Sequence, residues 1–338
     1  MKTYAHFSLR KYNTFGIDAV AERFVRLDSL QDYPDLLRSG MLRQSDFFVL
    51  GGGSNVVLPD HYNGLIVHPA NEGIRLIEDN GVSVLVEAQA GTSWTVFVDR
   101  CISEGWHGLE NLAGIPGSVG AAPVQNVGAY GREAKDAIEW VHCYDVTDGT
   151  QQVLPSSECQ FAYRYSIFKG PLKGRCLIDS VCFRLQHRFE PHLSYKGLAS
   201  ALSQMQLTNL TARQLADVVT DVRNAKLPNP NEIGSAGSFF KNPVVASEVY
   251  QRLKMQHPDL VAFENPNGSY KLAAGWLIEQ SGWKGRSLGR AAVYDKQALV
   301  LVNSGGATSS DVRALADAVI NDVEARFGVH LDCEAIFV

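Results

Sequence analysis

Paired cysteines are missing from the sequence. Its six cysteines, at positions 101, 143, 159, 176, 182 and 333, form no C-x-x-C pair and no Cys/His spacing typical of zinc. Unpaired thiols of this kind are typical of proteins in a reducing compartment. We therefore expect free cysteines, no disulfide framework and no bound metal ion.

Long apolar runs are missing as well. A membrane-spanning helix needs about 18 or more consecutive apolar residues, and no stretch of the chain reaches that length. The opening residues, MKTYAHFSLRKYNTFGID, also lack the apolar centre of a signal peptide. Both absences predict a cytoplasmic protein with no membrane partner.

A surplus of positive charge is also absent. The formal net charge is −5 and no long basic run occurs, so the electrostatic footprint of a nucleic-acid-binding protein is missing. Hydrophobic residues make up 45% and charged residues 20% of the chain, which is typical of a globular protein. A length of 338 residues predicts two or three domains.

The pattern that is present predicts an α+β fold. Brief apolar or alternating runs bounded by glycine and proline are typical of strands, and they cover 46–50, 64–68, 82–90, 137–146, 176–186 and 297–303. Apolar residues at helical spacing predict helices over 94–102, 211–222, about 270–281 and 309–327. Gly328 is placed to end the last helix, and TDGT at 147–150 predicts a hairpin turn.

Two glycine-rich stretches could bind a phosphate-containing cofactor. In FFVLGGGSNVVL (47–58), main-chain N–H groups freed by glycine could cradle a phosphate, or the glycines could simply form a tight turn. The stretch is not a dinucleotide fingerprint, because Val56 occupies a position that needs a small residue. Residues 105–131 hold seven glycines and almost no charge, which fits either a cofactor-wrapping segment or a buried structural loop.

Four polar residues could carry chemistry, and each has a plainer alternative. Arg164, among aromatics in FAYRYSIFK, could bind an anion or extend along the surface. Ser238, in GSAGSFFKNP, has no histidine in a recognisable partner motif, so a nucleophile is disfavoured, and a turn residue and a proton donor both stay open. Tyr195, in LSYKGL, and Glu334, near the chain end, could bind a ligand or simply be exposed.

Eight stretches taken together resemble one family. They are NTFGI (13–17), GGGSNVV (51–57), GLENLAGIPGSVGAAPVQNVGAYG (108–131), YRYSIFK (163–169), KLPNP (226–230), AGSFFKNP (236–243), KLAAGWLIEQ (271–280) and QALVLVN (297–303). In this order, over nearly the whole chain, they resemble the UDP-N-acetylenolpyruvoylglucosamine reductase (MurB) family, in the class with a substrate-covering tyrosine loop.

The resemblance implies a two-domain FAD-binding fold of the vanillyl-alcohol-oxidase type plus a third, α+β, substrate-binding domain. The implied boundaries are 1–68 with 329–338, then 69–222, then 223–328. FAD would be held non-covalently and largely through the main chain. The implied cofactor-binding residues are Gly51, Gly52, Gly53, Ser54, Asn55, Ile115, Gly117, Gly120, Ala121, Gln125, Gly128 and Arg223.

The resemblance also implies the reaction, which is reduction of UDP-N-acetylglucosamine enolpyruvate to UDP-N-acetylmuramate for peptidoglycan synthesis, with NADPH as co-substrate. A hydride would pass from flavin N5 to C3 of the enolpyruvyl group, and Ser238 would give a proton to C2. Arg164 and Glu334 would lie at the carboxylate end. The residues implied to hold the uridine diphosphate are Tyr195, Lys226, Asn242 and Gln297.

Some positions depart from the family pattern. Ile336 stands where a basic residue is common, and Ala121 and Ala122 stand where hydroxyl residues often bind flavin phosphate. Two alternatives stay open: another flavin oxidoreductase of the same fold, and a non-catalytic nucleotide-sugar binding protein. Residues 108–131 lack the histidine or cysteine that often tethers flavin in such oxidases. We expect a monomer.

Overall fold

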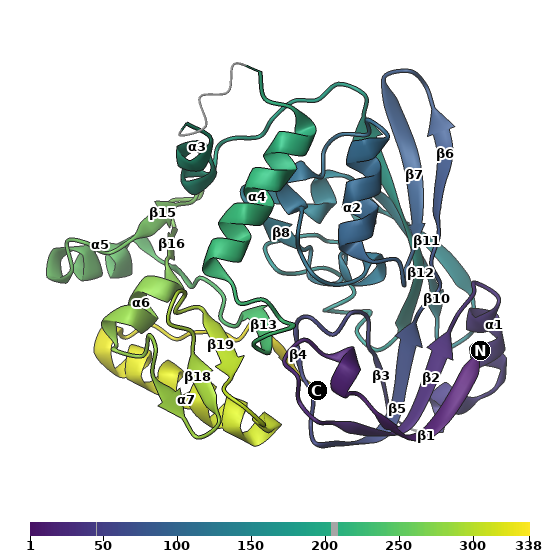
Figure 1. The fold of residues 1–338 in the computed structure, drawn as a ribbon, viewed down its shortest axis with the longest axis horizontal. Helices are drawn as coiled ribbons and strands as arrows, with labels where there is room; N and C mark the ends of the chain where they lie inside the picture. The colour runs from purple at the N-terminus through teal and green to yellow at the C-terminus, as the bar shows by residue number, and fades with distance from the viewer. Residues whose placement is uncertain (45, 204–208) are drawn as a thin grey trace. The chain divides into compact units, whose positions relative to one another are not determined.

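The computed structural model describes residues 1–338 apart from 45 and 204–208, and it divides into two compact units. Figure 1 shows the chain from purple at its N-terminus to yellow at its C-terminus. Unit 1 comprises Met1–Phe7, Ala21–Gly53 and Tyr62–Ala225, and unit 2 comprises Ser8–Val20, Ser54–His61 and Lys226–Val338.

One sheet of unit 1 is built around the N-terminal strands. Its order is β1 (Lys2–Ser8), β2 (Val20–Leu27), β5 (His61–Pro69) and β3 (Phe47–Val49). The parallel pairing of β3 with β5 places Phe47 opposite Leu65. Helix α1 (Asp32–Arg38) buries Tyr33 and Leu36 in a core shared with Leu65. The strand expected at 64–68 is therefore confirmed as part of β5.

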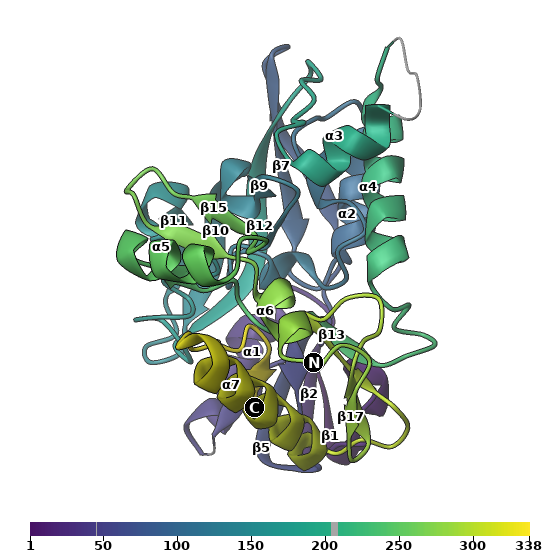
Figure 2. The same ribbon diagram turned by 90° about the vertical axis from the view of Figure 1, so that its left-hand side faces the viewer.

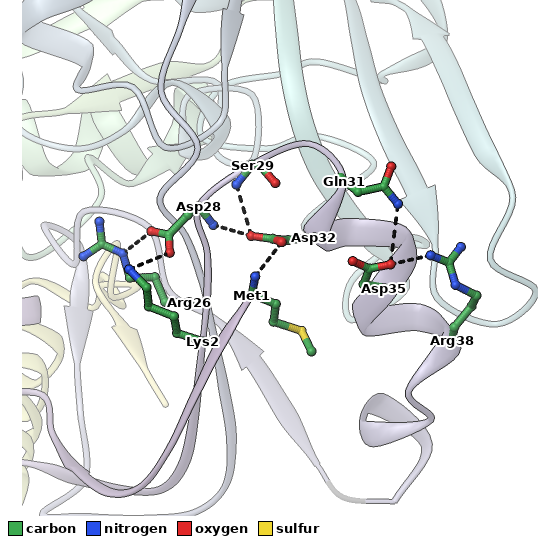
Figure 3. A network of polar contacts seen from close by, with 9 residues as sticks. All are labelled: Met1, Lys2, Arg26, Asp28, Ser29, Gln31, Asp32, Asp35 and Arg38. Carbon is green, nitrogen blue, oxygen red and sulfur yellow. Dashed lines mark hydrogen bonds and ion pairs between the residues drawn. The ribbon is translucent and has the colours of Figure 1, made fainter.

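Asp32 stabilises the start of α1. Its carboxylate accepts hydrogen bonds from the backbone N–H groups of Asp28 (2.7 Å) and Ser29 (3.1 Å), and it pairs with the ammonium of Met1 at 2.5 Å (Figure 3). Burial by itself raises the pKa of Asp32, but these donors together hold the pKa below its ordinary value. The network therefore joins β1 to the turn between β2 and α1.

The second sheet of unit 1 is antiparallel, in the order β11 (Gln151–Pro155), β10 (Ile138–Asp145), β12 (Cys176–Gln186), β7 (Ser83–Gln89) and β6 (Ile74–Asp79). Val84, Val86 and Ala88 alternate along β7 and enter a core with α2 (Trp94–Ser103) and α4 (Ala212–Lys226). Figure 1 shows both helices on one face of the sheet. The predicted hairpin at 147–150 is confirmed, since β10 pairs with β11.

Unit 2 contains two small sheets. The first has the order β13 (Ser235–Ser238), β19 (Val300–Asn303), β18 (Ala291–Val293) and β17 (Ser287–Leu288), and the second has the order β14 (Val244–Val245), β16 (Tyr270–Leu272) and β15 (Ala262–Glu264). Helix α7 (Ser309–Phe327) lies against β17, β18 and β19 (Figure 2). A parallel pair, β4 (Val56–Val57) with β20 (Ile336–Phe337), completes the unit.

One predicted helix is wrong at its start. The helix expected over about 270–281 is α6 (Ala274–Gln280), because Tyr270–Leu272 form β16 between β14 and β15. Hydrogen bonding to neighbouring strands outweighs the apolar spacing there. The strand expected at 297–303 likewise begins only at Val300, whose N–H donates to the Gln297 carbonyl in a turn.

The remaining elements are short. They are α3 (Lys196–Ser203), α5 (Ser247–Gln256), β8 (Gly128–Ala129), β9 (Arg132–Glu133) and 3-10 turns at Arg10–Tyr12, Met41–Arg43, Glu110–Leu112, Val119–Ala121, Ala134–Asp136 and Ser156–Glu158. Among the residues that the structure describes, no helix combines the length and the apolar character needed to cross a bilayer.

Candidate active site

The two glycine-rich stretches meet in unit 1. A Cβ atom on Gly52 would lie 2.8 Å from Cα of Gly117, and a Cβ atom on Gly51 would lie 2.6 Å from Oγ of Ser118. Real Cβ atoms do not approach a main chain this closely, so the two main chains can pass at Gly52 only because this position is glycine. Gly53 follows with φ +62°, a conformation that glycine adopts readily. We call this meeting of the two main chains, at Gly51–Gly53 and Gly117–Ser118, the glycine cradle.

The loop that forms the second wall of this cradle is held by backbone hydrogen bonds. Val119 N–H donates to the Thr92 carbonyl, and Gly120 N–H donates to the Ala90 carbonyl, both at 2.9 Å. A Cβ atom on Gly120 would lie 2.6 Å from Cβ of Ala90. The indole N–H of Trp94 fixes the preceding turn by donating to the Leu112 carbonyl at 3.0 Å. Main-chain hydrogen bonds and close packing therefore hold the loop in place beside the turn at Gly51–Gly53.

The predicted cofactor-binding residues fall mostly in unit 1. Only Ser54 and Asn55 belong to unit 2. Arg223, on α4, donates from Nε to the Gly114 carbonyl at 3.3 Å, and burial lowers the pKa of its guanidinium. The closely packed glycine main chains and a half-buried guanidinium fit a group that carries phosphates, such as a flavin dinucleotide.

Arg164 occupies the tip of a tight turn in unit 1. Ala162 and Tyr165 exchange two backbone hydrogen bonds across the turn, at 3.0 and 3.1 Å. Arg164 has φ +55°, and its guanidinium donates to the Gly128 carbonyl at 3.0 Å. A non-glycine residue in this conformation is uncommon and is held only by its surroundings. The guanidinium is therefore bound to the main chain, and its role as an anion ligand stays a prediction.

Ser238 and Glu334 lie on neighbouring segments of unit 2. Ser238 ends β13, opposite Val300 of β19. The N–H of Glu334 donates to the Phe239 carbonyl at 2.7 Å. Phe240 and Cys333 form an isolated antiparallel β-bridge. Glu334 is only 8% exposed, so the plainer alternative of a solvated glutamate near the chain end is wrong.

Two predicted substrate-binding residues gather at the start of α6 in unit 2. The side-chain oxygen of Asn242 accepts the N–H of Ala274 at 3.0 Å. The side-chain oxygen of Gln297 accepts the N–H of Leu299 at 3.4 Å, and a Cβ atom on Gly275 would lie 3.1 Å from it. In both residues the amide oxygen makes these contacts, and the amide nitrogen is the atom that could donate to a phosphate or a uracil carbonyl.

Tyr195 packs against the glycine-rich loop in unit 1. Lys226 is the last residue of α4. The Tyr195 ring packs edge-on to Tyr130 with 5.2 Å between centroids. The buried Asn111 amide donates to the carbonyls of Tyr130 and His192, both at 2.9 Å. The loop that carries Tyr195 is thus tied to the segment around Tyr130.

Sequence reasoning missed two buried amides in this region, Asn111 and Asn126. Each is at most 3% exposed, and each donates to the main chain of a distant segment. The available signal was an asparagine within an apolar, almost uncharged glycine-rich stretch, where it must find internal partners. Among the residues that the structure describes, no cluster of His, Cys, Asp and Glu could hold a metal ion.

Comparison with known proteins gives matches to two family models and to full-length relatives. Residues 21–154 match the FAD binding domain model, and residues 229–338 match the model of the UDP-N-acetylenolpyruvoylglucosamine reductase C-terminal domain. The chain is 48% identical to UDP-N-acetylenolpyruvoylglucosamine reductase of Neisseria meningitidis serogroup A, covering 96% of this chain and 94% of that one. It is 47% identical to the Bordetella pertussis protein of the same name, with coverages of 98% and 93%.

A solved structure gives the same fold. The crystal structure of UDP-N-acetylenolpyruvylglucosamine reductase (MurB) from Thermus caldophilus superposes with a TM-score of 0.66 at 23% identity, covering 99% of this chain and 98% of that one. The predicted α+β fold, an FAD-binding part followed by a further α+β part, is confirmed. The three domain boundaries stay a prediction.

Proposed function

The chain belongs to the UDP-N-acetylenolpyruvoylglucosamine reductase family of FAD-binding oxidoreductases, and we propose that it reduces UDP-N-acetylglucosamine enolpyruvate to UDP-N-acetylmuramate with NADPH. The observation that supports the proposal is the close approach of Gly52 to Gly117, which brings together the two glycine-rich main-chain segments proposed to hold the cofactor. The two glycine-rich segments and Arg223 would hold the flavin, which would supply hydride transfer from NADPH to C3 of the enolpyruvyl group. The protein supplies binding, charge and a proton.

Arg164 and Glu334 are proposed to act at the carboxylate end of the substrate. Hydride addition at C3 builds negative charge at C2 and on the adjacent carboxylate, and donors placed there in advance lower the barrier. The Arg164 fork can donate two parallel hydrogen bonds to a carboxylate, and its turn already holds it in a defined orientation. Glu334 can donate a hydrogen bond there only in its protonated form, and its burial means that water would weaken such an interaction little.

Ser238 is proposed to give the proton to C2. A serine nucleophile needs a base to remove its proton, whereas a serine that donates a proton to a carbanion does not. This role removes the need for a histidine partner, and it fits the half-buried position of Ser238 at the end of β13. The alkoxide left on Ser238 would regain its proton by relay from solvent, so that the serine is restored after each turnover.

The uridine diphosphate is proposed to be bound by Tyr195, Lys226, Asn242 and Gln297. Lys226 supplies a point charge suited to a phosphate. The amides of Asn242 and Gln297, both at the start of α6, supply donors with a fixed direction. We further propose a cytoplasmic monomer that binds neither nucleic acid nor membranes.

The two half-reactions test the role of Ser238 separately. In Ser238→Ala we expect NADPH to reduce the flavin at the wild-type rate, because no proton transfer to substrate is involved. Reoxidation by the enolpyruvyl substrate should slow by roughly 10²-fold or more, the usual contribution of a positioned acid. Stopped-flow absorbance of the flavin measures both rates.

Ser235→Ala is the matched control, since Ser235 lies on the same strand and should leave both rates unchanged. An unaffected reoxidation rate in Ser238→Ala would remove Ser238 as the donor. A wild-type flavin that NADPH reduces but the enolpyruvyl substrate fails to reoxidise would contradict the proposed reaction and would favour another flavin oxidoreductase.

A further inference from the structure

We propose that Asn126 is a positioning residue that holds the turn carrying Arg164 in place for the reaction. The inference rests on the role proposed above for Arg164, and it assigns to Asn126 a task that the cofactor-binding loop does not need for flavin binding. It depends only on contacts within unit 1, to which both residues belong.

The Asn126 side chain is completely buried and uses both of its donors. The amide nitrogen donates to Oε2 of Glu133 at 2.8 Å and to the carbonyl of Ala162 at 3.1 Å. The amide oxygen accepts the N–H of Lys135 at 3.0 Å. A buried amide with these partners has one preferred orientation, because rotating it would bring its oxygen against two acceptors.

The Ala162 carbonyl is the acceptor that closes the Arg164 turn. It receives the N–H of Tyr165 at 3.1 Å and, from outside the turn, the amide of Asn126. The hydroxyl of Ser166 donates to the Val124 carbonyl at 2.6 Å, and the Arg164 guanidinium donates to the Gly128 carbonyl at 3.0 Å. These hydrogen bonds join the turn, and Ser166 directly after it, to residues 124–128.

The Asn126 contact acts on the backbone of the turn, whereas the Gly128 contact acts on the guanidinium itself. When substrate draws the guanidinium toward its carboxylate, the backbone anchor keeps the turn fixed. The backbone conformation at the tip of the turn needs support from other residues, because Arg164 has φ +55°. This conformation costs free energy and persists only when its surroundings maintain it. A displacement of about 1 Å at a catalytic group can slow a reaction by about 10²-fold.

The backbone at Asn126 limits which residues can occupy the position. Asn126 has φ +48°, in the left-handed region where asparagine, aspartate and glycine are the tolerated residues. Glycine keeps this conformation but removes the amide. Aspartate keeps the shape but places a second carboxylate 2.8 Å from the Glu133 position and an acceptor against the Ala162 carbonyl. The two variants thus separate the hydrogen bonds from the backbone conformation.

The first experiment compares half-reactions in Asn126→Gly and Asn126→Asp. We expect wild-type flavin content and a wild-type rate of reduction by NADPH. Reoxidation by the enolpyruvyl substrate should slow on the order of 10²-fold, and the aspartate variant should be the slower of the two. Asn80→Gly, in the turn between β6 and β7, is the matched control and should leave both rates unchanged.

A double-variant comparison distinguishes action through Arg164 from a general loosening of the loop. If Asn126 acts through Arg164, adding Asn126→Gly to Arg164→Ala should slow reoxidation no further. Additive effects, or an equal fall in both half-reactions of Asn126→Gly, would overturn the inference. If Arg164→Ala itself has no effect, the proposed role of Arg164 fails, and with it the positioning role.

Hydrogen exchange tests the geometry without reference to the reaction. In Asn126→Gly the Tyr165 amide should exchange at least about tenfold faster than in the wild type, because its acceptor is no longer held. Exchange across β12 should be unchanged. An unchanged Tyr165 rate would contradict the positioning role even if the catalytic rates fell.

Discussion

Of the five non-glycine residues with positive backbone φ in the described part of the chain, three lie in the loops assigned to cofactor and substrate. Asn126 (+48°), Tyr130 (+49°) and Arg164 (+55°) all adopt it in unit 1, and hydrogen bonds connect the segments that carry them. Such conformations carry a cost that the surrounding structure must offset. Their concentration here supports a site in which a few residues are held in unusual but defined positions.

Gly52→Ala tests the glycine cradle. The added methyl would meet Cα of Gly117 at 2.8 Å, so one of the two backbone segments must move. We expect the affinity for FAD to fall at least about tenfold, measured as the flavin-to-protein absorbance ratio after purification and as Kd by flavin fluorescence.

A control separates close approach from backbone strain. Gly149 has φ +78° but open space around a built Cβ, so Gly149→Ala should destabilise the β10–β11 turn and leave flavin content normal. Full flavin content in Gly52→Ala would mean that the cradle is not the cofactor site.

Helix α7 shows how local sequence specifies an element of unit 2. Its N-terminus carries a capping box, in which Thr308 Oγ1 accepts the N–H of Asp311 at 3.2 Å and the Asp311 carboxylate accepts the N–H of Thr308 at 3.0 Å. At its C-terminus, Gly328 adopts φ +65°, as the sequence predicted. Both ends are thus determined by residues within a few positions of the helix.

Thr308→Ala tests this cap. Loss of the side-chain acceptor leaves one N–H of the first turn without its partner and should lower the free energy of unfolding by about 1 kcal/mol. Urea denaturation followed by circular dichroism measures the change. Thr308→Ser keeps the hydroxyl and should lower the free energy of unfolding much less. Equal stability of Thr308→Ala and the wild type would show that the cap contributes nothing here.

At the scale of the whole molecule, the candidate site residues divide between the two units. The glycine cradle, Arg164 and Tyr195 belong to unit 1, whereas Ser238 and Glu334 belong to unit 2. With the roles proposed above, flavin content tests residues of unit 1, and proton transfer to the substrate tests Ser238 in unit 2.

Stability of the whole protein should depend on pH through a buried carboxyl group. Asp179, on β12, is 3% exposed, and burial raises its pKa, with the charge of Glu87 acting in the same direction. A raised folded-state pKa means that ionisation costs more in the folded protein than in the unfolded chain. Stability is therefore lost as pH rises from the ordinary carboxyl pKa of about 4 through the raised value.

Asp179→Asn removes this titration. We expect the variant to gain stability relative to the wild type as pH rises through that window, and the difference to level off above it. Urea denaturation of both proteins between about pH 4 and 8 measures the difference. The pKa of Asp145 is lowered by the Thr147 hydroxyl and by Arg175, so this residue changes stability with pH in the opposite direction. It is present in both proteins and therefore does not affect the difference between them. A difference independent of pH would contradict the assignment.

The sequence alone determined the features that depend on neighbouring residues. Strand β12 has the expected bounds, Cys176–Gln186, and α7 has the expected bounds, Ser309–Phe327, because apolar periodicity and turn residues act locally. The family, the flavin and the α+β fold were equally accessible, since they rest on ordered motifs. Residues 270–272 were one failure, because strand neighbours from β14 and β15 outweighed helical spacing.

Only the tertiary structure decided which distant segments meet. Nothing near Gly52 in the sequence indicates that Gly117 will lie against it. Likewise, Asn126 resembles any other polar residue of a loop until its amide is seen on the Ala162 carbonyl. Local periodicity reports the conformation of a segment. A buried donor, however, must find its acceptor on a backbone segment that folding places next to it. That segment can be distant in the sequence, so the pairing is decided only when the whole unit has packed.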